Sequence, residues 1–361
     1  MRKIAIDARM LNHSGIGKYL KTILGHLVNE KQIALSLLVY KEQIGFFGSG
    51  PDYIVVKSSI YSIQEQLELF LKIPRCDVFW SPHFNIPLLP LKCLTRVVTI
   101  HDTYHLRFLN ELSLLKRIYS KLFYKMAVMK SDHIITVSQW SKSEIIKYTG
   151  CKKEVKKIYN GGPQYQKNNG TVKKQLLFVG NIKPHKNIDN AIKAFINIKN
   201  NNPSLGDYKF IIVGNLDNDK YGMKITNMCK TRNDVVLTGR VNDQTLLDLY
   251  STSEWFIMPS IYEGFGLPVL ESFSKGLPVL SSNAASIPEV GGKAVIYFNP
   301  NSVDDIGEKM MDAINRPEIR DSLIEKGKER LKLFTWDKTI KAHKNILLGI
   351  GKHEDKNISI G

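Results

Sequence analysis

Two glutamates and two glycines late in the sequence have the spacing expected of a site for a hydroxyl-rich anion. Glu263 and Glu271 lie eight residues apart with Gly264 and Gly266 between them, and Pro268 favours the start of a helix. Glycines before a helix N-terminus leave backbone N–H groups uncovered for a phosphate. Carboxylates accept hydrogen bonds from the paired hydroxyls of sugars and ribose. The segment therefore predicts a ligand with hydroxyls at both ends and phosphates between them.

A purely structural alternative exists for Glu271. If the helix begins at Pro268, Glu271 lies in its first turn, where an acidic side chain stabilises the helix dipole. Gly276 would then end the helix. This alternative explains each residue singly, whereas one ligand explains Glu263, the two glycines and Glu271 together.

Two further groups of residues follow predicted strands in the first half of the chain. Gly15 and Gly17 precede a helix expected from about Lys18, and glycine lets the backbone approach a ligand closely. A flexible turn is the alternative. His101 and Asp102 end an apolar run, which places them at the carboxyl edge of a sheet. There Asp102 could orient the imidazole, or it could cap the next helix.

Two isolated side chains add weaker signals. Lys186 precedes an amphipathic helix, so a cation and a helix N-terminus would meet there and favour an anion. A solvated surface lysine is the alternative. His83 follows another apolar run and is a weaker candidate at the same sheet edge as His101.

Short apolar runs that alternate with helical patterns would position these residues. The runs are continuous and rich in Val and Ile, as in parallel strands buried on both faces. They span 3–8, 33–40, 53–58, 77–82, 96–102, 133–138, 175–181, 208–214, 234–240, 255–260, 277–282 and 294–300. A polar stretch at 160–174 separates the two halves. We therefore predict an α/β protein with two doubly wound, Rossmann-like domains that face each other across a cleft.

The composition and net charge exclude some classes of protein and favour certain partners. The 361 residues include 51 Lys plus Arg and 34 Asp plus Glu, a net charge of +17, with 43% hydrophobic residues. This composition excludes collagen-like and wholly disordered chains, and no apolar run reaches the ~18 residues of a membrane-spanning helix. The four cysteines lack metal-site spacing and are typical of a reducing cytosol. The positive charge favours nucleic acid, an anionic membrane or phosphorylated ligands as partners.

Several motifs together resemble family 4 of the retaining glycosyltransferases of the GT-B fold. EGFGLPVLE matches the E-x7-E motif of that group. Further likeness lies in IDARMLNHSGIGKYL, IHD, VGNIKPHKN, TGRVNDQTLLDLY and SIPEVGG. The resemblance covers most of the chain. Within the family, the chain is similar to bacterial O-antigen and capsule mannosyltransferases.

The resemblance implies a role for each matching residue. Glu271 would hold the ribose of a nucleotide-sugar donor, Glu263 would contact the hydroxyls of the transferred sugar, and Lys186 would clamp the diphosphate. Gly15 and Gly17 would face the diphosphate from the first domain. The backbone N–H groups of Gly264, Phe265, Gly266 and Leu267 would bind the sugar or the diphosphate.

The reaction centre would also include His101, near the sugar and the acceptor, with Asp102 beside it. One departure from the family pattern is His185, where many relatives have Arg before the lysine. A neutral histidine is a weaker phosphate ligand than arginine, so this departure predicts a weaker diphosphate clamp.

The resemblance also gives the domain organisation. The predicted parts are an N-terminal acceptor-side domain at 1–162, a linker at 163–174, a C-terminal nucleotide-sugar-binding domain at 175–335, a C-terminal helix at 336–350 that would cross back to the first domain, and a polar tail at 351–361.

A basic amphipathic helix is predicted over 110–130. One face would pack on its own sheet; it comprises Leu115, Ile118, Tyr119, Leu122, Met126 and Met129. The outer face would touch anionic lipid headgroups through Lys116, Arg117, Lys121 and Lys125. Each such charge is worth up to ~1 kcal/mol at an anionic membrane.

These features predict a retaining glycosyltransferase that moves a hexose from a nucleotide-diphosphate sugar to a lipid-linked oligosaccharide in bacterial surface polysaccharide biosynthesis. GDP-mannose is mildly favoured as donor, with UDP-sugars close behind. No acidic DxD cluster ends a suitable strand, so no metal or other cofactor is expected. We expect a cytoplasmic protein, peripheral on the inner face of the plasma membrane.

Three alternatives stay open at this point. A sugar phosphorylase or a soluble disaccharide synthase could share the fold. The charge would suit a nucleic-acid-binding protein, but the sequence carries no recognition-helix module, and nucleic acid is not expected as a partner. An NAD-dependent enzyme would need a third glycine where residue 20 is leucine.

Overall fold

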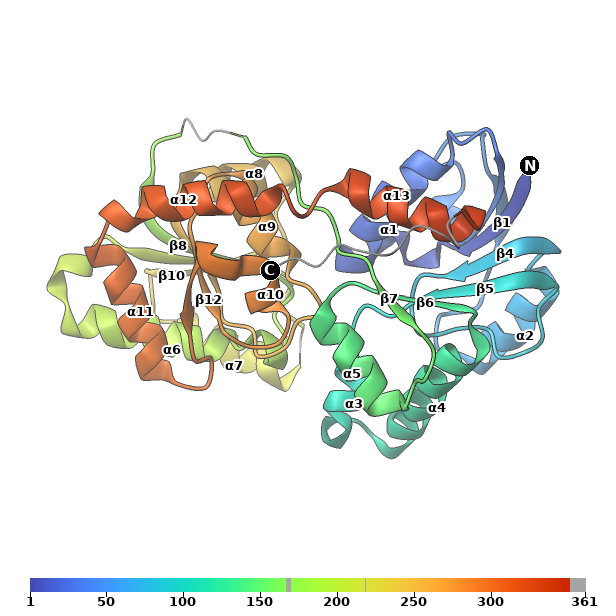
Figure 1. The fold of residues 1–361 in the computed structure, drawn as a ribbon. Helices are drawn as coiled ribbons and strands as arrows, with labels where there is room; N and C mark the ends of the chain where they lie inside the picture. The colour runs from blue at the N-terminus through green and yellow to red at the C-terminus, as the bar shows by residue number, and fades with distance from the viewer. Residues whose placement is uncertain (167–169, 218, 351–361) are drawn as a thin grey trace. The chain divides into compact units, whose positions relative to one another are not determined.

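The computed structural model describes residues 1–166, 170–217 and 219–350. The chain divides into two compact units (Figure 1). Unit 1 comprises Met1–Gly161 together with the chain from Trp336 onward, and unit 2 comprises Gly162–Thr335. Each unit is built on one parallel sheet covered by helices.

The sheet of unit 1 has seven parallel strands in the order β3-β2-β1-β4-β5-β6-β7. Its strands are β1 (Arg2–Asp7), β2 (Ile33–Val39), β3 (Asp52–Val55), β4 (Cys76–Ser81), β5 (Cys93–Thr99), β6 (His133–Thr136) and β7 (Val155–Lys157). The direction of winding reverses between β1 and β4. In doubly wound sheets ligands bind beyond the carboxyl ends of the strands at such a reversal.

Helices cover both faces of the unit 1 sheet. On one face α1 (Ser14–Leu27) packs beside α13 (Trp336–Leu348), two segments far apart in the sequence (Figure 1). The other face carries α2 (Ile63–Lys72), α3 (Tyr104–Arg107), α4 (Leu114–Lys130) and α5 (Gln139–Thr149). Short 3-10 helices span η1 (Arg9–Asn12), η2 (Lys41–Gln43) and η3 (Leu109–Glu111). Double coverage explains why adjacent residues such as Ala5 and Ile6 are both buried.

The sheet of unit 2 repeats the same pattern with six parallel strands in the order β10-β9-β8-β11-β12-β13. Its strands are β8 (Lys173–Val179), β9 (Lys209–Val213), β10 (Val235–Gly239), β11 (Ser253–Met258), β12 (Val279–Ser282) and β13 (Val295–Phe298). The winding reverses between β8 and β11, so the loops after these strands are where a ligand is expected.

Helices also cover both faces of the unit 2 sheet. One face packs on α6 (Ile188–Asn201), α7 (Lys220–Cys229) and α11 (Val303–Asn315) through Phe178, Phe210 and Trp255. On the other face Tyr250 of α8 (Asp243–Thr252) stacks on Phe256. The remaining helices are α9 (Leu267–Ser274), α10 (Ile287–Gly291), α12 (Glu318–Leu331), η4 (Pro184–Lys186), η5 (Pro203–Leu205) and η6 (Gly292–Ala294).

The predicted α/β class with two doubly wound domains is confirmed. Each of the predicted apolar runs contains a strand, but β7 was not predicted. This strand is only three residues long and contains two lysines, so it carries no continuous apolar signal. Among the described residues, no helix has the length and apolar character needed to cross a membrane.

The predicted linker at 163–174 belongs to unit 2, which begins at Gly162. Within the predicted linker, the Gln166 N–H donates to the Ser274 carbonyl at 2.7 Å, and β8 begins at Lys173. Helix α13 belongs to unit 1. Residues 167–169 of the predicted linker and the predicted tail at 351–361 lie outside the described residues.

The predicted orientation of the basic helix is wrong. Helix α4 buries Ser120, Phe123, Tyr124, Ala127 and Val128. Most residues of the predicted core face are exposed instead: Leu115, Ile118, Leu122 and Met129. The sequence pattern misled because aromatic Phe123 and Tyr124 fill the space over the sheet, and the other apolar stripe is left on the surface.

Candidate functional site

The loop after β11 in unit 2 carries the residues that the E-x7-E spacing singled out. It is held by Ser286, whose hydroxyl donates to the carbonyls of Glu263 and Phe265 at 2.9 and 3.0 Å. The Phe265 ring is buried beneath the loop. Gly266 has φ of 105°, a left-handed conformation that favours glycine, and precedes α9 as its N-cap. The loop is therefore a fixed structure that ends at a helix N-terminus.

Lys186 and Glu263 meet in this unit although 77 residues separate them. Lys186 Nζ lies 2.6 Å from Glu263 Oε1, and their side chains are 19% and 12% exposed. Asn187 locks the lysine turn in place because its amide donates to the carbonyls of Pro259 and Pro300 at 3.1 and 2.7 Å. The pair is accessible at a strand carboxyl edge, where a ligand can compete for both charges.

The predicted position of Glu271 in the first turn of its helix is wrong. Helix α9 begins at Leu267, so Glu271 is its fifth residue, and no acidic residue occupies the first turn. Dipole compensation therefore does not explain Glu271. Instead the Tyr250 hydroxyl donates to Glu271 Oε2 at 3.1 Å, and burial, followed by Glu271, raises the pKa of Tyr250. A neutral phenol thus orients the carboxylate.

His185, the departure from the family pattern, is held without charge at neutral pH. Burial and then the neighbouring Lys186 lower its pKa to about 4, although Glu263 opposes them. Its carbonyl accepts the Ile261 N–H at 2.9 Å, which ties the lysine turn to the end of β11. His185 therefore adds no second positive charge beside Lys186.

Gly15 and Gly17 of unit 1 were predicted to lie before the helix, but they lie inside it. Helix α1 begins at Ser14, so Gly15 and Gly17 are inside its first turn. A Cβ on Gly17 would lie 2.4 Å from the Leu11 carbonyl oxygen, whereas a Cβ on Gly15 would meet nothing. Close packing against the backbone of Leu11 explains why residue 17 is a glycine. The donor roles implied for both glycines stay predictions.

His101 lies at the carboxyl edge of the unit 1 sheet, as predicted. Its Nε2 lies 2.9 Å from the Pro82 carbonyl, which can only accept, so Nε2 carries the proton. Burial lowers the pKa of His101 to about 4, opposed by the Pro82 bond. The ring stands edge-on to Tyr19, with 4.8 Å between ring centroids. His101 is thus a neutral imidazole in a fixed orientation.

Asp102 uses one of its oxygens in the turn that leads into α3, whose N-cap is Thr103. Its Oδ1 accepts the Tyr104 N–H at 2.9 Å, at the start of α3. A neutral His101 that donates through Nε2 has a lone pair at Nδ1, which cannot donate to a carboxylate. The proposed orientation of the imidazole by Asp102 is therefore not supported. A contact of either residue with substrate stays a prediction.

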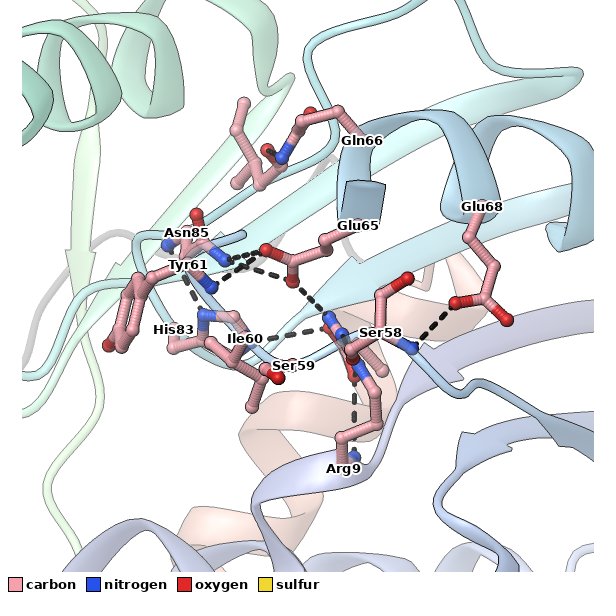
Figure 2. Close-up of polar contacts among 12 residues, drawn as sticks. Arg9, Ser58, Ser59, Ile60, Tyr61, Glu65, Gln66, Glu68, His83 and Asn85 are labelled. Carbon is pink, nitrogen blue, oxygen red and sulfur yellow. Dashed lines mark hydrogen bonds and ion pairs between the residues drawn. The ribbon is translucent and has the colours of Figure 1, made fainter. Parts of the chain in front are cut away.

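A buried charged network in unit 1 was missed by the sequence analysis (Figure 2). Arg9 donates from Nη2 to Asp7 Oδ2 at 2.6 Å and to Glu65 Oε1 at 2.5 Å, and all three side chains are 0% exposed. His83 lies 3.3 Å from Asp7, and the Asn85 amide donates to Glu65 at 2.8 Å. Burial would raise the pKa of Asp7, but Arg9 holds it well below its usual range. The only sequence signal was an Asp at the end of β1 followed two residues later by an Arg.

The basic residues of α4 occupy a surface that also carries exposed apolar side chains. Lys116, Lys121 and Lys125 are exposed. Arg117 is half-buried and donates to the carbonyls of Leu112 and Asn110 at 2.8 and 2.9 Å. Helix α4 exposes Leu114, Leu115, Ile118 and Leu122, and α2 separately exposes Ile63, Leu67, Phe70 and Leu71.

Comparisons with known proteins agree with this architecture. The model of "Glycosyltransferase Family 4" matches residues 36–161, and the model of "Glycosyl transferases group 1" matches residues 164–330. The chain belongs to family 4 of the GT-B glycosyltransferases. Within the described part of this glycosyltransferase, no group of three or more His, Cys, Asp or Glu side chains could hold a metal ion.

Named relatives of this glycosyltransferase include two O-antigen enzymes. It is 30% identical to O-antigen chain mannosyltransferase B of Escherichia coli over 58% of this chain and 60% of the relative. It is 29% identical to O-antigen chain mannosyltransferase RfbU of Salmonella typhimurium over 71% of this chain and 72% of the relative. The chain thus spans about two thirds of the length of the curated relatives it matches.

A solved structure shares the fold. WaaG, described as a glycosyltransferase involved in lipopolysaccharide biosynthesis, matches with a TM-score of 0.76 at 16% identity, over 96% of this chain and all of that one (100%). The strand order of both units and this likeness support the GT-B fold.

Proposed function

We propose that this glycosyltransferase moves a hexose, with retention of configuration, from a nucleotide-diphosphate sugar to a lipid-linked saccharide of a bacterial surface polysaccharide. One observation carries the proposal: Lys186 and Glu263 meet at 2.6 Å at the same strand edge as the loop that leads into α9. A cation, a carboxylate and a helix N-terminus together suit a phosphate that is joined to a sugar.

Donor binding would exchange the internal ion pair for contacts with the ligand. Lys186 and the backbone N–H groups of Gly264 to Leu267 would bind the diphosphate. Glu263 would accept hydrogen bonds from the hydroxyls of the sugar. Glu271, held by the Tyr250 hydroxyl, would accept the ribose hydroxyls. Breaking the bond between the anomeric carbon and the β-phosphate adds negative charge to the leaving diphosphate. Lys186 would therefore stabilise the transition state more than the ground state.

The transfer step that we propose takes place on one face of the sugar. The anomeric carbon leaves the β-phosphate oxygen and bonds to the acceptor oxygen, and the acceptor proton passes to the leaving phosphate. Lys186 supplies the positive charge for this step, and we expect no divalent metal. His101, neutral at pH 7, would hydrogen-bond a sugar or acceptor hydroxyl rather than act as a cation.

GDP-mannose is our first choice of donor, and UDP-sugars follow. The support is that the two relatives above are named as O-antigen mannosyltransferases. The O-antigen chains in the names of these relatives also support a saccharide acceptor of a surface polysaccharide.

We further propose that the protein binds peripherally to the cytoplasmic face of an anionic membrane. Support comes from Lys116, Lys121 and Lys125 beside exposed Leu115 and Ile118 on α4. Apolar side chains that enter the headgroup region and lysines that meet anionic lipids act together in such binding. A lipid-linked acceptor would be presented at that surface.

A thermal-shift panel of nucleotide sugars tests the donor assignment. GDP-mannose, UDP-glucose, UDP-galactose and UDP-N-acetylglucosamine should be compared with NAD and with random duplex DNA. A ligand that binds only the native state raises the melting temperature, so we expect one nucleotide sugar to do so. Stabilisation by NAD or DNA alone would contradict the proposal. The anomeric configuration of the product, read by NMR, tests retention.

A further inference from the structure

Tyr61 has an unusual backbone conformation at the surface of unit 1. It is one of three non-glycine residues with positive φ in the described chain, at 73°. For a residue with a bulky side chain this conformation is unfavourable, and such outliers persist only where the surrounding structure holds them. Tyr61 lies just before Ser62, the N-cap of α2.

The buried charged network holds this backbone in place. The Tyr61 N–H donates to Glu65 Oε2 at 2.9 Å. Glu65 is fixed in turn by Arg9 and by the Asn85 amide, and none of these side chains reaches solvent (Figure 2). Asn85 also accepts a hydrogen bond from the Tyr119 hydroxyl of α4. Residues of η1, α2, α4 and the loop after β4 thus fix the position of a single exposed tyrosine.

Other aromatic rings brace the Tyr61 side chain. Its ring stacks on Phe84 with 5.9 Å between centroids and 27° between planes, and Phe84 stacks on Tyr124 at 4.0 Å. Tyr119 meets the Tyr61 ring edge-on at 6.0 Å. Even so, Tyr61 stays 47% exposed, and Figure 2 shows its ring pointing away from the charged network. A rigid aromatic ring is therefore presented to the outside.

Polar groups of the candidate reaction centre lie nearby. The aromatic stack that braces Tyr61 reaches Asp102, because the Tyr124 hydroxyl donates to the Asp102 carbonyl at 3.1 Å. Burial, then Glu65 and then Asp102 also raise the pKa of Tyr61 to about 12. Asp102 follows His101 at the carboxyl edge of the same sheet. A sugar ring has an apolar C–H face and a rim of hydroxyls, so an aromatic ring beside a carboxylate matches both.

We propose that Tyr61 is a platform on which a saccharide ring of the acceptor rests, with its hydroxyls toward Asp102. The inference builds on the proposed function and names the acceptor subsite. Exposed Ile63 and Leu67 continue from Tyr61 along α2, so the lipid part of the acceptor would extend along an apolar surface. The strained backbone keeps the ring ready before the acceptor arrives, which lowers the entropic cost of binding.

The binding test uses octyl glycosides of mannose, glucose, galactose and N-acetylglucosamine as probes. Saturation-transfer-difference NMR measures their contact with wild-type protein, Tyr61→Ala, Tyr61→Phe and the control Phe46→Ala. Phe46 is a matched control because it is an aromatic residue of unit 1 with 49% exposure. We expect at least one glycoside to bind wild type, Tyr61→Phe and Phe46→Ala similarly, and Tyr61→Ala to bind about tenfold more weakly because one ring face of apolar burial is lost.

Three outcomes would overturn the proposal. Wild-type protein could bind none of the glycosides, Tyr61→Ala could bind them as wild type does, or Tyr61→Ala could lose affinity for anionic liposomes while glycoside binding is unchanged. The last outcome would make Tyr61 a membrane anchor. Melting temperatures of all variants exclude unfolding as the cause.

Donor binding separates this inference from the proposed function. The donor-induced thermal shift should be the same in wild type and Tyr61→Ala. If no nucleotide sugar shifts the wild type, the proposed function fails, but a loss of glycoside binding in Tyr61→Ala would still establish the saccharide platform.

Discussion

Charged side chains gather at the carboxyl edge of both sheets, but their exposure differs. In unit 2 the Lys186–Glu263 pair retains 19% and 12% exposure, whereas in unit 1 the Asp7–Arg9–Glu65 group has none. An accessible pair can exchange its partner for a ligand. A fully buried group cannot do so without leaving a charge unpaired. The same residue types therefore serve binding in one unit and rigidity in the other.

Removing the buried cation should have the largest effect on stability. Arg9→Ala leaves two buried carboxylates without their partner, so we expect a loss of about 3–5 kcal/mol in the free energy of unfolding, measured by denaturant titration. The matched control is Arg232→Ala, which breaks a partly exposed pair with Asp234 and should cost less than about 1 kcal/mol. Equal losses in the two variants would erase the distinction between the units.

Glu271→Ala should act mainly on activity and leave the protein folded, although the buried Tyr250 hydroxyl loses its acceptor. Loss of the ribose contact is expected to reduce transfer by about a hundredfold or more, corresponding to roughly 3 kcal/mol. The control Glu325→Ala removes an exposed glutamate of the same unit and should transfer sugar at the wild-type rate. Turnover close to wild type in Glu271→Ala would remove this residue from the donor site.

Lys186→Ala should weaken donor binding and make it less sensitive to salt. The loss of one charge-assisted contact predicts an affinity about tenfold or more lower, equivalent to roughly 1.5–3 kcal/mol. Isothermal titration calorimetry at two salt concentrations measures both effects. Lys224→Ala, which breaks an exposed pair with Asp189, is the control. Unchanged affinity would mean that Lys186 only forms an ion pair with Glu263 and does not contact the donor.

The double change of Lys116 and Lys121 to Glu should reduce cosedimentation with anionic liposomes. With up to ~1 kcal/mol for each charge, the partition coefficient should fall about tenfold or more. Changing Lys209 and Lys230 of unit 2 to Glu alters the net charge equally and should have less effect. If both pairs act alike, net charge alone governs binding, and the α4 surface has no special role.

Acid should weaken the packing of α13 on α1, the smallest of these effects. His343 is buried against Tyr19, and burial lowers its pKa to about 4. An unfolded imidazole titrates near 6.5, so this stability is complete above about pH 6.5 and declines as the pH falls toward 4. We expect a loss of roughly 1–2 kcal/mol at about pH 5, which His343→Gln should reduce. His26→Gln, an exposed control, should keep the full pH dependence.

The sequence predicted what depends on local pattern. Continuous apolar runs located the strands because both faces of each sheet are covered, and the carboxyl-edge positions of His101 and Glu263 followed from those strands. Partners distant in the chain could not be predicted. Nothing in the sequence pairs Arg9 with Glu65 or Tyr250 with Glu271, because these contacts depend on the tertiary fold. The face of α4 was misjudged for the same reason: two apolar stripes compete, and only packing decides between them.

The most direct test of the donor site is a crystal structure of the protein with GDP or UDP bound. We predict ribose hydroxyls within hydrogen-bond distance of the Glu271 carboxylate and phosphates against Lys186 and the start of α9. A nucleotide bound elsewhere, or Glu271 turned away from a nucleotide in this unit, would contradict it.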